Sequence, residues 1–156
     1  MGIEIERRWL IKEHLWFPLA QGKTLIRQGY LSLDPARTER IRFETGRPPV
    51  FCIKGLADGI KTPEHETEVN ASFARAAWDM CGDFTLEKMR YRIPYEGVTI
   101  EVDEFIGKLE GLYLAEVEFT ADYELFEAPS WFGKEVTADH RYRNAMLVQH
   151  GIPIPE

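Results

Sequence analysis

The sequence predicts an α+β fold in which short β-strands form most of the domain and a few helices flank them. Polar and apolar residues alternate in several short segments, which is the pattern of strands with one buried face. Glycine, proline and Asp-Pro signals separate these segments. A helical period of apolar residues is confined to short stretches. The chain has 156 residues, enough for a sizeable core, and we expect a single domain over residues 1–156.

Charge and composition exclude several classes of function. The chain carries 19 Lys and Arg against 26 Asp and Glu, a net charge of −7, which argues against non-specific binding to nucleic acid or to an anionic membrane. No apolar run approaches the length of a membrane span, and the acidic start of the chain does not resemble a signal peptide. Cys52 and Cys81 form neither a disulfide framework nor a metal-spaced set. We therefore expect a cytoplasmic protein with reduced thiols.

The first expected strand, residues 3–9, has an unusual polar face. Successive side chains on a strand point to opposite faces, so Glu4, Glu6 and Arg8 share one face and apolar residues occupy the other. Two carboxylates and a guanidinium are an unusual number of charged groups for one solvent-facing side of a single strand. For this segment alone, a solvated outer face with weak ion pairs remains the simpler interpretation.

Four more strands are expected before the first helix. Alternation and turn residues place them at residues 24–32, 37–45, 50–55 and 65–70. The charged residues on their polar faces are Arg40 and Arg42 on the third strand, Lys54 on the fourth, and Glu66 and Glu68 on the fifth. These strands therefore continue the charge pattern of the first one.

The second half of the chain begins with a helix and returns to strands. A 3.6-residue apolar period predicts a helix over residues 71–81, capped by Asn70 or Ser72 and ended by Gly82. Strands are expected at residues 84–93, 99–105 and 112–119, and a hairpin turn at Glu96-Gly97 joins the first two. The charged residues on their polar faces include Lys88, Arg90, Glu101, Asp103, Glu116 and Glu118.

The C-terminal part is expected to consist of loop and helix. Residues 122–127 are compatible with one short helix, and residues 129–133 with a loop. Thr137 is expected to cap a last helix over residues 138–150, which Gly151 ends.

Two architectures fit strands that are charged on one face and apolar on the other. In a sandwich, the apolar faces meet inside and the charges face water. In a closed barrel, the charges line the lumen and the apolar faces point outward under helices. Like charges spaced two residues apart only repel one another on an outer face, whereas in a lumen they can bind ligands of opposite charge. Since buried charges without partners are costly, a charged lumen implies a charged occupant.

The pattern of charges favours a polyphosphate accompanied by a divalent metal ion. Carboxylate oxygens are the ligands that Mg²⁺ and Mn²⁺ prefer, and the four scattered histidines do not indicate zinc. Arg40 and Arg42 suit bidentate contacts with phosphate, while Lys54 and Lys88 suit point-charge contacts. The sequence has no glycine-rich phosphate loop, which excludes P-loop chemistry.

Several of these motifs resemble those of the CYTH family, whose members are also called triphosphate tunnel metalloenzymes. The segment Glu4-Ile5-Glu6-Arg7-Arg8 resembles the ExExK signature that opens the family. The other matches follow in the family's order: Gln28-Gly29-Tyr30, Arg40-Ile41-Arg42, Lys54-Gly55, Glu66-x-Glu68, Glu87-Lys88-x-Arg90-Tyr91, Glu101-x-Asp103-x-Phe105 and Glu116-Val117-Glu118-Phe119. The segment from Glu135 to Asn144 resembles the end of small bacterial members, so the resemblance covers nearly the whole chain.

The resemblance implies an eight-stranded antiparallel closed barrel with a charged lumen, flanking helices and a C-terminal helix that closes one end. It implies an enzyme that depends on Mg²⁺ or Mn²⁺ and hydrolyses a small-molecule triphosphate, most directly inorganic tripolyphosphate to pyrophosphate and phosphate. The metal ligands carried over by position are Glu4, Glu6, Glu116 and Glu118. The substrate-binding residues are Arg8, Arg40, Arg42, Lys54, Lys88 and Arg90. The catalytic residues are Glu66, Glu68, Asp103 and Lys88. The resemblance implies that Glu66, Glu68 and Asp103 serve either a second metal ion or the attacking water, which Glu66 and Glu68 would position or deprotonate.

One position departs from the family pattern, because Arg8 stands where the family usually has Lys. Arginine can still bind phosphate, but it cannot release a proton near neutral pH. Alternative functions are a class IV adenylyl cyclase or a thiamine triphosphatase on the same tunnel, or a non-catalytic module that binds polyphosphate or nucleotide. The chain is compatible with a monomer or a homodimer. The aromatic residues that could serve a dimer or pack within the monomer are Trp16, Phe17, Trp131 and Phe132.

Overall fold

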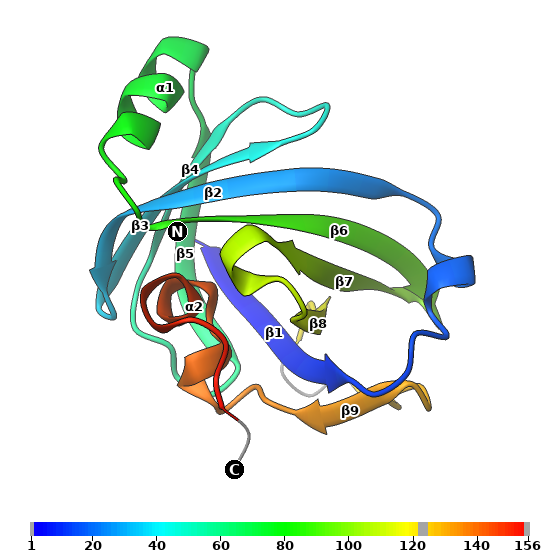
Figure 1. Ribbon diagram of the computed structural model, residues 1–156. Coiled ribbons are helices and arrows are strands. Elements are labelled where there is room, and N and C mark those ends of the chain that lie inside the picture. The colour runs from blue at the N-terminus through cyan, green and yellow to red at the C-terminus, as the bar shows by residue number, and fades with distance from the viewer. Residues whose placement is uncertain (1, 122–124, 155–156) are drawn as a thin grey trace.

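The computed structural model describes residues 2–121 and 125–154, and a closed eight-stranded antiparallel β-barrel dominates it (Figure 1). The barrel strands are β1 (Gly2–Ile11), β2 (Lys23–Asp34), β3 (Arg37–Glu44), β4 (Val50–Lys54), β5 (Lys61–Glu68), β6 (Thr85–Tyr95), β7 (Val98–Ile106) and β8 (Tyr113–Glu118). Their order around the barrel is β1, β5, β4, β3, β2, β6, β7, β8, and the ring closes where β8 pairs with β1. The expected eight-stranded barrel is confirmed.

The strand β1 closes the barrel with three partners instead of two. Its first residues, Gly2 to Ile5, pair with β5, while its later residues pair with β8 along the other edge. A ninth strand, β9 (Phe132–Glu135), pairs with Trp9 and Ile11 on the edge that β5 has left. This strand begins within the stretch that was expected to be a loop. Its four residues carry no alternating pattern, and it forms because the free edge of β1 offers unpaired backbone groups.

The helix α1 (Ala71–Asp79) begins where the sequence predicts. The side chain of Asn70 caps it by accepting a hydrogen bond from the Phe73 backbone N–H at 2.8 Å. Ala77 in the helix and Cys81 beyond its end are buried against the barrel. A Cβ atom on Gly29 of β2 would lie only 2.7 Å from the Cys81 sulfur, so glycine is required for this close approach.

The C-terminal segment differs from the prediction. The last helix, α2 (Asn144–His150), begins six residues later than expected, because Arg143 has an extended backbone and a short 3₁₀ turn, η3 (His140–Tyr142), precedes it. Thr137 caps no helix. The helix α2 lies at one end of the barrel, as expected (Figure 1). Of the short helix expected at residues 122–127, residues 122–124 lie outside the described residues, and residues 125–127 adopt no helical structure.

The hairpin between β6 and β7 follows the prediction. Its two loop residues, Glu96 and Gly97, both have positive φ, at 45° and 83°, as a type I′ turn requires. Two further 3₁₀ turns, η1 (Phe17–Leu19) and η2 (Gly107–Leu109), lie in the connections that follow β1 and β7.

The largest apolar cluster lies outside the barrel, on the outer faces of β1, β6, β7 and β8. Its strand residues include Trp9, Tyr91, Ile93, Ile100, Val102, Ala115 and Val117. Irregular segments cover this cluster in place of the expected helices. Trp16 and Trp131 from these segments are 2% and 5% exposed and Phe132 of β9 is 6% exposed, so all three pack within the monomer, whereas Phe17 stays 61% exposed.

A second outer cluster lies where α1 covers β3, and a third fills one end of the lumen. The lumen-facing residues of β6, β7 and β8 are charged along most of the barrel but apolar at the α2 end, where they are Leu86, Phe105 and Leu114. These three side chains pack with Tyr142 and Leu147 from the C-terminal segment. The charged part of the lumen is therefore bounded at the α2 end by apolar side chains. Within the described ranges, no helix combines the length and hydrophobicity needed to cross a membrane.

Candidate functional site

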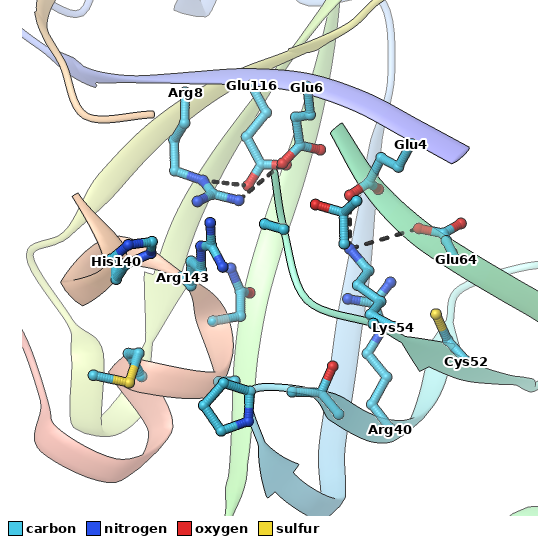
Figure 2. A pocket seen from close by; sticks show the side chains of 18 of the residues that line it. Glu4, Glu6, Arg8, Arg40, Cys52, Lys54, Glu64, Glu116, His140 and Arg143 are labelled. Carbon is cyan, nitrogen blue, oxygen red and sulfur yellow. Dashed lines mark hydrogen bonds and ion pairs between the residues drawn. The ribbon is translucent and has the colours of Figure 1, made fainter. Parts of the chain in front are cut away.

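The lumen contains a cavity of about 550 Å³, a size typical of small-molecule sites, and residues from all eight barrel strands line it. Figure 2 shows part of this lining. The predicted site residues that line it are Glu4, Glu6, Arg8, Arg40, Arg42, Lys54, Glu66, Lys88, Arg90, Glu116 and Glu118. Alternation along each strand brings them to one side of the sheet, and closure of the sheet makes that side the interior. The charged faces therefore point inward, as the barrel hypothesis required.

Two residues predicted to be catalytic do not line the cavity. Glu68 is the last residue of β5 and is exposed beyond the lining. Asp103 is fully buried behind the lining, where its carboxylate contacts Lys88 and Arg90. Asp103 thus positions two cations and does not reach the cavity itself. Alternation predicts the face of a strand correctly, but it does not tell where along the strand the cavity ends.

Arg90 and Lys88 are held by Asp103 in a buried ionic network. Asp103 accepts two hydrogen bonds from Arg90, from Nε at 2.8 Å and Nη2 at 2.9 Å, and its Oδ2 lies 2.8 Å from Lys88 Nζ. Lys88 Nζ also donates to Asn144 Oδ1 of α2 at 2.8 Å. Burial lowers the pKa of Lys88 to about 8 even though Asp103 favours its charged form. This lysine can therefore change protonation state near neutral pH.

Arg8 points into the lumen and binds two acids. Its Nη2 lies 2.8 Å from Glu6 and its Nε 3.2 Å from Glu116. Burial alone would raise the pKa of Glu116, but the charges of Arg8, Lys88 and Arg90 hold that pKa well below its ordinary value. Arg8 is thus a fixed cation between acids that could otherwise bind a metal ion.

Carboxylates are crowded along β1, β5 and β8. Burial and the neighbouring charges of Glu116 and Glu4 raise the pKa of Glu6 well above its ordinary value. Burial and the charge of Glu4 raise the pKa of Glu64 to about 7. Glu4 itself stays ionised because Lys54 Nζ lies 2.8 Å away, which lowers its pKa against the effect of burial. Such crowding of hard oxygen donors fits a divalent cation, which would relieve the repulsion.

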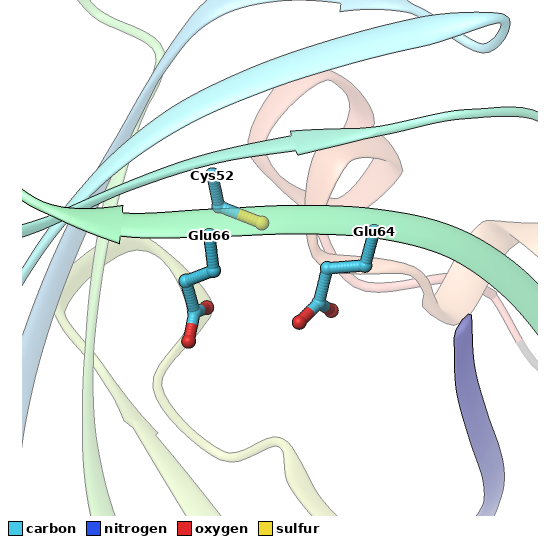
Figure 3. A group of neighbouring side chains, drawn as sticks. All are labelled: Cys52, Glu64 and Glu66. Carbon is cyan, nitrogen blue, oxygen red and sulfur yellow. The ribbon is translucent and has the colours of Figure 1, made fainter. Parts of the chain in front are cut away.

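Among the described residues, Cys52, Glu64 and Glu66 form the one group whose potential ligand atoms all lie within 4.8 Å of one another (Figure 3). The four predicted metal ligands do not form such a group. The sequence analysis missed Glu64, because the fifth strand was expected to begin at residue 65, whereas β5 begins at Lys61. Its spacing of two residues from Glu66 was the signal that could have identified it.

Whereas β1, β5 and β8 bring acids close together, β3 brings two arginines, Arg40 and Arg42, into the lumen. In the described part of the chain, the buried Nε atoms of both arginines have no hydrogen-bond partner, and Arg42 makes no ion pair. Arg40 Nη2 approaches Glu66 only to 3.9 Å. Burial, together with the charges of Arg40 and Arg90, lowers the pKa of Arg42 to about 10. A buried guanidinium without an ion pair, such as that of Arg42, favours an anion as ligand.

The C-terminal segment adds residues to the cavity that the sequence analysis did not select. Arg143 and His140 lie across from the strands, and Figure 2 shows Arg143 near Arg8. The expected helix over residues 138–150 gave no reason to single out either side chain. Their position depends on how this segment folds back over the barrel.

Comparisons with known proteins agree with this geometry. A family model described as the CYTH domain matches residues 2–147. The inorganic triphosphatase of Acetivibrio thermocellus is 38% identical over 151 residues, which are 96% of each chain. The inorganic triphosphatase of Nitrosomonas europaea is 33% identical over 149 residues, or 92% of this chain and 95% of that protein. A crystal structure of an inorganic triphosphatase matches with a TM-score of 0.67 and 32% identity, covering 100% of this chain and 99% of the other.

Proposed function

Because the chain belongs to the CYTH domain family, we propose that it is a metal-dependent enzyme that hydrolyses inorganic tripolyphosphate to pyrophosphate and phosphate. One observation carries the proposal: the same cavity contains both crowded carboxylates and arginine side chains whose buried Nε atoms have no hydrogen-bond partner. The carboxylates favour a cation and the guanidinium groups favour an anion. A polyphosphate bound with a divalent metal ion satisfies both. Similarity to inorganic triphosphatases along nearly the whole chain supports this substrate.

The acids that would hold Mg²⁺ or Mn²⁺ all line the cavity: Glu4, Glu6, Glu64, Glu116 and Glu118. When bound, the metal ion withdraws charge from the phosphate oxygens and the leaving group. The donors are carboxylate oxygens, which both ions accept.

The protein side chains would act on the substrate mainly by position and charge. In the proposed reaction, the oxygen of water forms a bond to a terminal phosphorus, the bridging P–O bond breaks, and pyrophosphate leaves with the electron pair. Arg40, Arg42 and Lys54 bind the phosphate oxygens and stabilise the charge that develops. Glu66, which lines the cavity, would accept the proton of the attacking water.

Lys88 and Arg90 complete the site from the side of β6. Asp103 fixes the orientation of both, so they present their charges without rearrangement. Because the pKa of Lys88 is near 8, this residue can donate a proton to the departing pyrophosphate. Arg8 cannot transfer a proton, so its role is to bind phosphate and to orient Glu6 and Glu116.

We also propose that the chain works as a single domain in the cytoplasm, as a monomer or homodimer. Its substrate is then a small molecule, and neither nucleic acid nor a membrane is a partner. The net charge of −7 supports this, because a strongly acidic protein repels both surfaces.

A panel of tripolyphosphate, thiamine triphosphate and ATP, each with Mg²⁺ and with Mn²⁺, tests the proposal. We expect the highest kcat/KM with tripolyphosphate and equal amounts of pyrophosphate and phosphate as products. Formation of cyclic AMP from ATP would identify a cyclase instead. Binding of all three compounds without turnover in either metal would identify a non-catalytic binding module.

A further inference from the structure

A thiol and two carboxylates meet where β4 and β5 line the cavity, and Figure 3 shows the three side chains together on these strands. Cys52 of β4 lies directly opposite Glu66 of β5 in the strand register, and Glu64 precedes Glu66 by two residues on the same face. One potential ligand atom from each residue lies within 4.8 Å of the other two. The register of two strands therefore assembles a group that no spacing along the sequence indicates.

Two polar atoms of this group are buried without a hydrogen bond. In the described part of the chain, Glu64 Oε2 is buried and has no hydrogen-bond partner. The Cys52 side chain is only 1% exposed, and its sulfur makes no hydrogen bond within the same residues. Since buried polar atoms are normally paired, both atoms have capacity for a ligand.

The two cations beside the group do not occupy its ligand atoms. Lys54 Nζ lies 2.8 Å from Glu4 Oε1 but 3.6 Å from Glu64 Oε2, which is too long for a hydrogen bond. Arg40 Nη2 approaches Glu66 Oε2 only to 3.9 Å. Both carboxylates of the group therefore remain available to a metal ion.

The donor atoms of this group differ from those of the other acids in the lumen. Mg²⁺ and Mn²⁺ prefer oxygen ligands, whereas Zn²⁺ accepts thiolate sulfur together with carboxylate oxygen. Three protein ligands leave a fourth position on Zn²⁺ for water. Burial raises the pKa of the Cys52 thiol, but a thiol that coordinates zinc is deprotonated outright. On binding, the sulfur forms a bond to the ion and the thiol proton passes to water.

We infer that Cys52, Glu64 and Glu66 form a site for a thiophilic divalent cation such as Zn²⁺, and that this cation inhibits hydrolysis. The inhibition rests on the proposed function, in which Glu66 accepts the proton of the attacking water and Glu64 holds the activating metal ion. A zinc ion that binds both carboxylates withdraws them from these roles. The binding itself does not depend on what the protein hydrolyses.

Titration of the metal-free protein with Co²⁺, a spectroscopic substitute for Zn²⁺, tests the site. Wild type should show the near-ultraviolet charge-transfer band of a Co²⁺–thiolate bond, and added Zn²⁺ should abolish it. Cys52→Ala should lack the band. Cys81→Ala is the matched control and should keep it, because Cys81 is equally buried but packs near α1, outside the cavity. Absence of the band in wild type, or an equal band in Cys52→Ala, would overturn the inference.

Inhibition by Zn²⁺ of tripolyphosphate hydrolysis with Mg²⁺ tests the second part, and the activity of each variant with Mg²⁺ alone is its own reference. The Zn²⁺ concentration for half inhibition should be at least about tenfold higher in Cys52→Ala than in wild type and Cys81→Ala, since even an outer partner of a metal ligand has an effect of this size. Zn²⁺ also binds free tripolyphosphate, but that effect is the same for all three proteins. Equal inhibition of the three would show that zinc does not inhibit through Cys52.

The outcomes separate this inference from the proposed function. If the wild type hydrolyses no tripolyphosphate with Mg²⁺ or Mn²⁺, the proposed function fails, while the Co²⁺ band still decides whether the metal site exists. If hydrolysis is normal and the band is absent, the metal site is wrong and the proposed function stands. Thermal unfolding of each variant without metal identifies misfolding, and Cys52→Ser then replaces Cys52→Ala.

Discussion

Arg90 and Arg42 enter the same lumen, but their surroundings differ completely. Arg90 lies on β6 directly opposite Asp103 of β7, with which it forms two hydrogen bonds of 2.8 and 2.9 Å. Arg42 lies on β3 opposite Gln28 of β2 and Val50 of β4, neither of which is an acid. Burial and its cationic neighbours lower the pKa of Arg42 to about 10, whereas Asp103 holds the pKa of Arg90 above its ordinary value.

This difference teaches that one charged lumen can have two functions. We call the β6, β7 and β8 side, with Lys88, Arg90, Asp103 and Glu116, the paired wall, and the β3 side, with Arg40 and Arg42, the open wall. On the paired wall, Asp103 and Glu116 provide acidic partners for Lys88 and Arg90 without any ligand, so these charges contribute to the fold as well as to the proposed site. On the open wall, Arg42 has no ion pair and its buried charge is disfavoured in the free protein, which an anion bound as proposed would correct.

The largest effect is expected where the carboxylates are most crowded. Glu6→Gln should reduce kcat for tripolyphosphate about 100- to 1,000-fold, because it removes a proposed metal ligand where charge develops during the reaction. The thermal stability of the metal-free protein should stay unchanged or rise, since burial and the charges of Glu116 and Glu4 already raise the pKa of Glu6 and disfavour its ionised form. Release of phosphate and thermal unfolding measure the two quantities. A wild-type rate in Glu6→Gln would show that this acid is not a metal ligand.

The second prediction tests the two walls directly with the same substitution. Arg90→Met should lower the free energy of unfolding by about 3–5 kcal/mol, because it leaves the Asp103 carboxylate buried with one partner fewer. Arg42→Met should leave that free energy within about 0.5 kcal/mol of wild type or raise it, because it removes a cation that lacks a partner. Urea unfolding without metal or substrate measures both values.

The activities of the same two variants, Arg42→Met and Arg90→Met, complete the comparison. Arg42→Met should lose about 100-fold in kcat/KM despite its intact stability, since the charge of Arg42 is used only when an anion is bound. The distinction between the walls would collapse if Arg42→Met unfolded as easily as Arg90→Met, or if it retained full activity.

A smaller effect on activity is expected when Lys88 loses its proton at alkaline pH. Burial lowers its pKa from the ordinary 10.5 to about 8, so kcat/KM should decrease as pH rises above about 8 and the lysine loses its proton. Stability has the opposite trend: between about pH 8 and 10.5 the unfolded chain binds this proton more tightly than the folded chain, so Lys88 makes the free energy of unfolding rise with pH. Measurements of kcat/KM and of the free energy of unfolding between pH 6 and 10, on wild type and Lys88→Arg, separate the titration of Lys88 from that of the substrate. If the variant shows the same alkaline decrease, Lys88 is not its cause.

The smallest effect is expected at the end of β5. Glu68→Gln should change kcat/KM less than about twofold, because Glu68 is exposed and does not line the cavity. Glu66→Gln, two residues earlier on the same face, serves as the matched variant inside the cavity and should reduce kcat by at least about tenfold as the proposed acceptor of the water's proton. Equal losses in the two variants would mean that the functional lumen extends further along β5 than the cavity does.

Much of the fold was predictable because the relevant signals are local. Alternation with a period of two placed Glu4, Glu6 and Arg8 on one face, and Glu96-Gly97 identified the hairpin. The errors lie where tertiary contacts overrode local preference. The strand β9 forms only because β1 has a free edge, and irregular segments that carry Trp16 and Trp131 cover the barrel where helices were expected.

The sequence by itself determined which side chains share a face, since adjacent residues of a strand must point in opposite directions. It could not determine which of those charges meet a partner. Arg42 and Arg90 alternate with apolar neighbours in the same way, and only the register of paired strands put Asp103 opposite one of them and no acid opposite the other. Register and the path of the C-terminal segment depend on closure of the whole barrel, so tertiary structure alone decided which cations have an acidic partner on a neighbouring strand and which have none.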